Sequence, residues 1–259
     1  MSLWHAEREL KKVGRKDLAK IVAGVREAYG ADVPLPQAQS QEKSKRTQSK
    51  SVEIPQPVEL DLDSEWQRQS AKFVDLGYHA ELGQTEEEAY LESLPKFEPQ
   101  PQEYQGKFDV PLLVETRIPW QKQAELAGIS LSDYLRVRIE KTTPWEGSRS
   151  EVPSAPYTGW FNNWGQRFPK NIAPSKARNQ LAKDEVGAGP FEGIALQIAH
   201  PEFIKNRKYF DLIGSQVESD RVVSLDGWSG RPGLYAHRDG NATDDFRPLV
   251  RGSKIVTGN

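Results

Sequence analysis

"KYFDLIGSQVESDRVVSLDGWSGRPGLYAHR", residues 208–238, contains three short segments that alternate or run apolar over the length of a β-strand. Turn-forming Gly, Ser, Asp and Pro residues separate these segments. Strands joined by such short connections pair antiparallel. A further strand-like segment, "PLVRGSKIV", follows at residues 248–256. The C-terminal part of the chain is therefore expected to form a largely antiparallel sheet.

Helical patterns accompany these strands. Residues 63–80 place Trp66 and Phe73 on one face and end near Gly77. Further helices are expected at 85–94 with Thr85 as N-cap, at 119–128 with Pro119 in the first turn, at 173–185 and at 189–200, and further strands at 109–118, at 133–141 and within 157–168. The mixture predicts an α+β fold in which helices pack on a mixed, largely antiparallel sheet.

The composition of the chain divides it into three parts. Residues 31–58 are rich in Gln, Ser, Lys and Pro, which predicts a disordered linker. Residues 1–30 show two short amphipathic helical patterns around Gly14, which predicts a small helical hairpin. A hairpin of this size buries little apolar surface alone, so we expect it to dock on the rest of the chain, a second copy or a protein partner. Residues 59–259 are expected to form the α+β domain.

Several classes of protein can be set aside. The 259 residues include no Cys, so disulfides and thiolate metal sites are excluded. The four His are far apart in sequence and form no H-x-x-x-H pair, so we expect neither a metal site nor a cofactor. No apolar run has the length of a membrane helix, and charges occupy the place of a signal-peptide core. We therefore expect a cytoplasmic protein, in which the Asn241 sequon is unused.

The charge distribution is uneven along the chain. Residues 1–30 carry seven Lys or Arg against four Asp or Glu, whereas residues 59–105 carry three against twelve. The basic end could contact nucleic acid, an acidic protein surface or the acidic segment of the same chain. No RNA-binding motif or aromatic–basic platform accompanies it, so nucleic acid is the less favoured partner.

The catalytic motifs that can be tested fail. His237-Arg238-Asp239 matches the start of a kinase catalytic loop, but Asp244 stands where a kinase requires Asn. Only 20 residues follow Asp239, too few for the rest of a kinase lobe. The segment "GAGPFEG" lacks the Lys-Ser/Thr of a phosphate-binding loop, and "GWSGR" lacks the first Gly of a hydrolase nucleophile elbow.

Two groups of residues remain as binding candidates. The first surrounds the C-terminal hairpin and consists of Glu192, Trp228, Arg231, His237, Arg238 and Asp239. The plainer interpretation is a helix-capping role for Glu192 and an ordinary hairpin for the rest. The second group is Trp160 and Trp164, within the aromatic segment "YTGWFNNWGQRF". These rings either seal a sheet edge or offer a stacking surface for a sugar or base.

A set of short motifs is spread over residues 65–235. "EGIAL" at 192–196, Gly214-Ser215 and "GRPGL" at 230–234 are accompanied upstream by "FVDLGYHA" and "VPLLVETRIP". The pattern resembles an uncharacterised, mainly actinobacterial family known as a domain of unknown function. The resemblance implies one soluble bacterial domain over residues 59–259 and carries no activity, and hence no catalytic residues.

Three functions follow from these observations. The favoured one is a non-catalytic binding or protein-interaction module, because a well-patterned domain fails each catalytic motif tested. The first alternative is a hydrolase or transferase of unidentified type, with a pocket near the aromatic segment and the C-terminal hairpin. The second is nucleic-acid binding through the basic N-terminus.

Overall fold

The computed structural model describes residues 60–145, 152–164, 166–227 and 230–258. All of them belong to one compact unit, residues 58–259. The hairpin expected at residues 1–30 and the linker expected at 31–58 lie outside the described residues.

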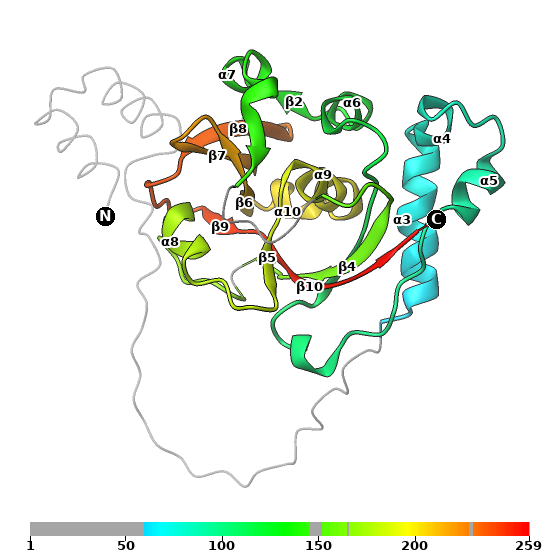
Figure 1. Cartoon of the computed structure of the whole chain (residues 1–259), viewed down its shortest axis with the longest axis horizontal. Coiled ribbons are helices and arrows are strands. Elements are labelled where there is room, and N and C mark those ends of the chain that lie inside the picture. The colour runs from blue at the N-terminus through cyan, green and yellow to red at the C-terminus, as the bar shows by residue number, and fades with distance from the viewer. Residues whose placement is uncertain (1–59, 146–151, 165, 228–229, 259) are drawn as a thin grey trace, which may run out of the picture. The chain divides into compact units, whose positions relative to one another are not determined.

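Helices and strands are mixed along the unit (Figure 1). The helices are α3 (Leu62–Asp75), α4 (Tyr78–Glu81), α5 (Glu87–Glu92), α6 (Trp120–Leu126), α7 (Asp133–Arg136), α8 (Pro174–Arg178), α9 (Pro190–Ala199) and α10 (Glu202–Lys205), with 3-10 turns at Gln102–Tyr104 and Ile139–Lys141. The strands are β1 (Val110–Val114), β2 (Ser130–Leu131), β3 (Thr142–Pro144), β4 (Tyr157–Phe161), β5 (Glu185–Gly187), β6 (Tyr209–Val217), β7 (Arg221–Asp226), β8 (Gly233–Arg238), β9 (Phe246–Pro248) and β10 (Val250–Thr257).

The strands form two sheets. Sheet A has the order β1-β4-β10-β5 and is antiparallel throughout. Sheet B has the order β2-β8-β7-β6-β3, with β9 also paired to β6. Its β2–β8 and β6–β9 pairs are parallel and the remaining pairs are antiparallel. The expected α+β fold with a mixed, largely antiparallel sheet is confirmed.

The two sheets are joined where β9 of sheet B continues into β10 of sheet A. Leu249, between these strands, donates its N–H to the Asp211 carbonyl at 2.9 Å and accepts from Ala188 at 3.0 Å. Gly214 of β6 donates to the Ala188 carbonyl at 2.8 Å. These bonds tie β5 to the middle of β6, so the sheets curl around a shared interior.

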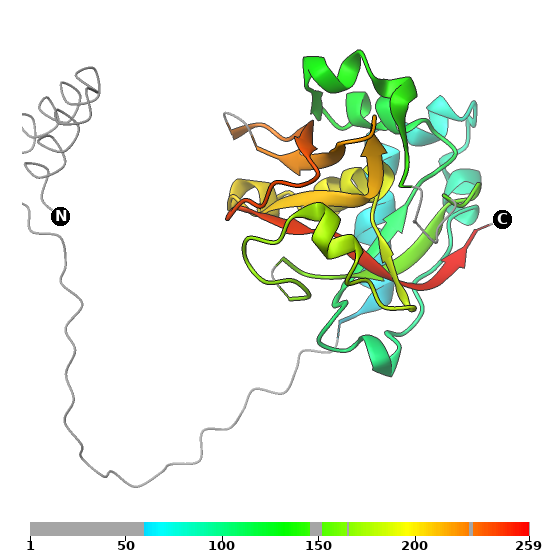
Figure 2. The ribbon, with the colours of Figure 1, turned by 60° about the vertical axis from the view of Figure 1, so that its left-hand side comes forward.

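Helix α9 occupies that interior, between the strands of the two sheets (Figures 1 and 2). It begins with Gly189 as N-cap and Pro190 at the first helical position, which suits proline because no N–H is needed there. Ile194, Ala195 and Leu196 are buried, and the main hydrophobic cluster surrounds them with side chains of both sheets. The most apolar helix of the sequence therefore forms the centre of the core.

Helix α3 covers the outer edge of sheet A. Its N-cap, Asp61, accepts from the N–H groups of Asp63 and Ser64 at 3.1 Å each. Trp66 and Phe73 are buried, as the helical spacing predicts. Between them, the Gln69 amide bonds to the free edge of β1, accepting from Leu113 N at 2.9 Å and donating to the Pro111 carbonyl at 2.8 Å. A side chain thus takes the place of a neighbouring strand.

Several expected elements differ in the structure. The helix expected at 173–185 ends at Arg178 as α8, and Glu185 begins strand β5. Residues 133–141 alternate in polarity, which predicts a strand, but they form α7 and a 3-10 turn. Ser132 caps α7 by accepting from Leu135 N at 3.3 Å, and Leu135 is fully buried, so capping and burial override the alternation. Helix α5 begins at Glu87, with Glu86 rather than Thr85 at the N-cap position and without a side-chain cap. Pro119 likewise lies at the N-cap of α6, one residue before the expected position.

Candidate functional site

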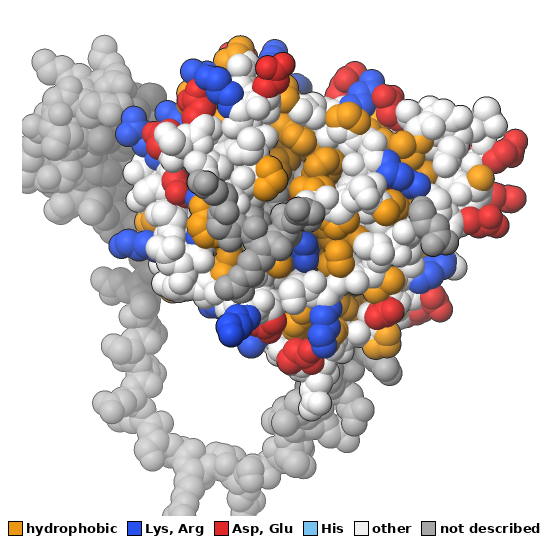
Figure 3. All heavy atoms as spheres, viewed as in Figure 1, with side chains coloured by type: hydrophobic (Ala, Val, Ile, Leu, Met, Phe, Trp, Pro, Cys, Tyr) orange, Lys and Arg blue, Asp and Glu red, His pale blue; other side chains and the backbone are white. Residues whose placement is uncertain are grey.

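A cavity of about 90 Å³ lies where the two sheets meet. Its walls come from β3, β5 and β6, from the start of α9, from Trp120 of α6 and from Val152. Figure 3 shows hydrophobic side chains gathered near the centre of the same face of the domain, between α6 and β10. The cavity is the place where residues far apart in the sequence converge around a polar group.

Glycines shape this cavity by letting backbones approach closely. Gly187 of β5 and Gly214 of β6 face each other, and a Cβ atom on Gly187 would lie 2.7 Å from the Gly214 nitrogen. Neither strand can retreat, because Gly214 N also bonds to the Ala188 carbonyl. Gly187, considered above as part of a glycine-rich loop, therefore has a packing role, whereas Gly189 is the N-cap of α9.

Glu192 is the charged group among the described residues that line the cavity. Its Oε2 accepts from Gly189 N at 2.9 Å, which is the helix-capping role that the sequence suggested. Its Oε1 accepts from the Tyr157 hydroxyl at 2.6 Å, and the Arg251 Nε lies 3.7 Å away. Burial, and next the Glu192 charge, raise the pKa of Tyr157 well above its usual value, so this hydroxyl stays a donor at neutral pH.

The sequence predicted Glu192 but not its two partners. Tyr157 is fully buried in β4 and Arg251 is 3% exposed in β10, and both contact α9 only because the sheet junction folds them over it. Arg251 Nε has no hydrogen-bond partner among the described residues. The sequence offered one signal for Arg251, namely a basic residue inside the largely apolar run "PLVRGSKIV".

His237 lies elsewhere, on β8 of sheet B. Its Nδ1 is 3.6 Å from Asp211 Oδ1 and its Nε2 is 3.8 Å from Asp226 Oδ2, while Phe246 packs edge-on at 4.4 Å. In β6, Leu212 packs against Gly193 of α9, and successive side chains of a strand point to opposite faces. Asp211 and His237 therefore lie on the face of sheet B away from α9, and the structure does not bring His237 and Glu192 into one pocket.

The other candidates of the C-terminal hairpin are dispersed. Arg231 and Arg238 are exposed, and Trp228 lies outside the described residues. Asp239 accepts from Arg178 Nη1 at 2.8 Å, and Arg178 also donates to the carbonyls of Ile213 and Ser215, where β6 departs from regular pairing. Asp239 thus helps to hold a β-bulge, a role that follows from the tertiary structure alone.

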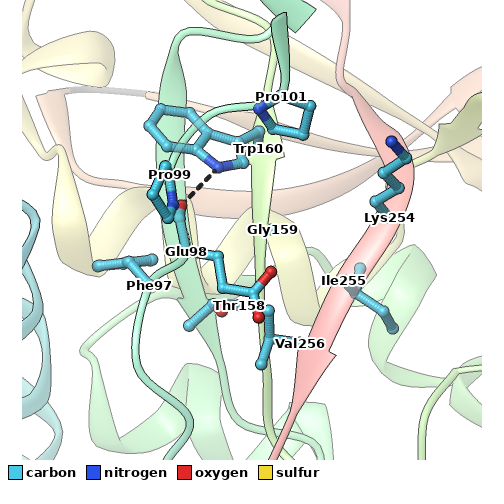
Figure 4. Close-up of a pocket in the computed structure, with 10 residues that line it drawn as sticks. All are labelled: Phe97, Glu98, Pro99, Pro101, Thr158, Gly159, Trp160, Lys254, Ile255 and Val256. Carbon is cyan, nitrogen blue, oxygen red and sulfur yellow. Dashed lines mark hydrogen bonds between the residues drawn. The ribbon is translucent and has the colours of Figure 1, made fainter.

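The two aromatic candidates are mainly packing residues. Trp160 is 8% exposed, and its Nε1 donates to the Glu98 carbonyl at 3.2 Å. It borders a cavity of about 60 Å³ between the proline-rich segment 97–101 and β10 (Figure 4). Trp164 is half-buried, donates to the Tyr209 carbonyl at 3.2 Å and has the Arg247 guanidinium 4.5 Å from its ring centre. The two rings therefore do not form a shared, open surface on which a sugar or base could stack.

Neither a cluster of metal ligands nor a membrane-spanning helix occurs in the described residues. Within them, no three His, Asp or Glu side chains are arranged to hold a metal ion. No helix of the described ranges has the length and apolar character that crossing a bilayer requires. Comparison of the chain with protein-family models, with curated proteins and with solved structures finds no match.

Proposed function

We propose that residues 60–258 form a non-catalytic binding module whose ligand enters the cavity beside Glu192. The observation that carries the proposal is a buried carboxylate on the wall of a cavity whose other walls are mainly apolar side chains and glycine backbone, with three hydroxyl residues, Thr142, Thr143 and Ser215. Ligand sites are typically concave, mainly apolar and furnished with few polar groups, which is the arrangement here.

Two of the three hydroxyl groups that line the cavity are used in hydrogen bonds to the backbone, which favours binding over catalysis. Ser215 Oγ donates to the Leu212 carbonyl at 2.7 Å, and Thr142 Oγ1 donates to the Arg138 carbonyl at 3.2 Å. Activated nucleophiles instead bond to a neighbouring base, and His237 lies on the other face of sheet B. An enzyme that combines Glu192 and His237 in one site is therefore not supported.

A fragment screen tests the proposal. Ligand-observed NMR on the full chain, with cationic, anionic and neutral fragments of up to about six non-hydrogen atoms, should reveal binders. Val152→Trp should abolish their binding, because Val152 lines the cavity and is 43% exposed, so a larger side chain can cover the opening without disturbing the core. The matched control is Val137→Trp, at a valine that is 73% exposed and lies outside the cavity.

The outcome is decisive in either direction. Binding that is lost in Val152→Trp and kept in Val137→Trp supports the module. The proposal is overturned if no fragment binds, or if fragments bind the two variants equally.

The sequence supports three wider proposals. Residues 1–30 dock on a protein partner as a helical hairpin, in preference to nucleic acid. The absence of Cys favours a cytoplasmic location. The "EGIAL" and "GRPGL" motifs favour membership of the actinobacterial family described above.

A further inference from the structure

The charge of the cavity wall has a single sign. Among the described residues that line it, Glu192 alone is charged. Arg251 is close to the carboxylate but is not part of the lining. The carboxylate of Glu192 accepts from the N–H of the α9 N-cap, so a negative charge already lies at the positive end of this helix. An anionic ligand would be repelled, and a cation would be attracted.

The carboxylate of Glu192 keeps capacity to accept further hydrogen bonds. An ionised carboxylate offers about four acceptor positions. Among the described residues, the Tyr157 hydroxyl and Gly189 N–H donate to it, one to each oxygen. The Arg251 Nε, 3.7 Å from Oε1, is too distant for a hydrogen bond. The carboxylate therefore has acceptor positions left for a further donor.

The remaining walls suit an unbranched hydrocarbon chain. Trp120, Pro144, Val152, Pro190 and Phe191 line the cavity around Glu192. Its volume of about 90 Å³ corresponds to about three water molecules, or at interior density to about five non-hydrogen atoms. Aromatic walls also tolerate a positive charge, because the ring face is electron-rich.

We infer that the cavity binds a primary alkylammonium group, four methylene groups ending in a charged nitrogen, as at the end of a lysine side chain. The inference rests on the binding module proposed above and names the chemistry of its ligand. The ammonium donates to Glu192, and the methylene groups pack between the apolar walls. A free amine or a lysine of a partner protein could supply this group.

A series of probes with the same four-carbon chain tests the inference. The full chain is titrated with 1-aminobutane, 1-butanol and butanoate, and NMR shift changes give the dissociation constants. We expect 1-aminobutane to bind at least about 10-fold more tightly than 1-butanol, and butanoate to bind least, since charge-assisted hydrogen bonds are the stronger ones. Binding of 1-aminobutane should disappear in Val152→Trp and persist in Val137→Trp.

Glu192→Gln adds a second measurement. This variant should reduce the preference for 1-aminobutane over 1-butanol to about 1-fold. Because the change also removes the charge beside Arg251 and could impair folding, the probe series on the unaltered chain decides the question by itself. A tetrapeptide containing Lys, compared with the same peptide containing norleucine, then distinguishes a protein lysine from a free amine.

Failure of the inference differs from failure of the binding module. If 1-butanol or butanoate binds as tightly as 1-aminobutane, and Val152→Trp abolishes that binding, the ammonium inference is overturned and the module stands. If Val152→Trp changes none of the three affinities, both are overturned.

Discussion

At the scale of single residues, Gln69 shows how a side chain can complete a sheet. Its amide satisfies the Leu113 N–H and the Pro111 carbonyl on the free edge of β1, and Gln69 is 2% exposed. A buried backbone group that loses its partner costs about 1–3 kcal/mol. The side chain therefore stabilises the domain through hydrogen bonds rather than through apolar contact.

Gln69→Leu should lower the free energy of unfolding by about 2–4 kcal/mol, because it leaves two buried backbone groups of β1 unpaired. Urea denaturation of the two proteins measures the difference. Gln67→Leu is the control, since Gln67 is exposed on the same helix and should change stability by less than about 0.5 kcal/mol. Equal effects of the two substitutions would show that Gln69 contributes no strand-like bonds.

Residue roles were predictable from the sequence where the partner is local. The capping role of Glu192 follows from its position three residues after Gly189. Its bond to Tyr157, 35 residues away, and the tie between Arg178 and Asp239, 61 residues apart, depend on how the sheets fold together. Spacing along one element carries no information about such contacts.

At the scale of elements, the strands of residues 208–238 and helix α9 follow directly from hydrophobic pattern and terminal Gly and Pro residues. The helical structure of residues 133–141 did not follow from the pattern, because the alternation of these residues competes with the Ser132 cap and with the buried Leu135. The division of the strands into two sheets was not predicted either. It depends on β5 meeting β6 through Gly187 and Gly214, which the sequence presents as ordinary glycines.

Gly187→Ala should therefore be strongly destabilising, by about 2–4 kcal/mol, because the new methyl group would meet only backbone atoms of β6. The thermal unfolding midpoint reports the effect. Gly240→Ala is the matched control, since a Cβ atom there has no neighbour within 4 Å. A Gly187→Ala protein as stable as the Gly240→Ala protein would contradict the close approach of the two sheets.

At the scale of the whole molecule, sheet B holds an ionisable group that couples folding to pH. Asp211 is 4% exposed, and its Oδ1 makes no hydrogen bond within the part of the chain that the structure describes; His237 Nδ1 lies 3.6 Å away. Burial raises the pKa of Asp211 above its usual value, while His237 and Arg178 act in the opposite direction and Asp239 adds to the rise. Ionised Asp211 is thus more costly in the folded protein than in the unfolded chain.

An acid whose pKa is higher when folded gives its full contribution to stability below the unfolded pKa of about 3.9, and loses it as pH rises through the folded pKa. Asp211→Asn removes this loss, so we expect the variant to be more stable than the parent protein at pH 7, by roughly 1–2 kcal/mol. The difference should shrink towards pH 4. Urea denaturation between pH 4 and 8 measures both trends.

Asp220→Asn controls for the change in net charge, because the Asp220 side chain is 58% exposed and should give a nearly flat difference across this range. If Asp211→Asn is instead less stable at pH 7, the contacts that Asp211 makes in sheet B outweigh the cost of burying its charge. A difference that does not vary with pH would show that Asp211 ionises equally in the folded and unfolded chain.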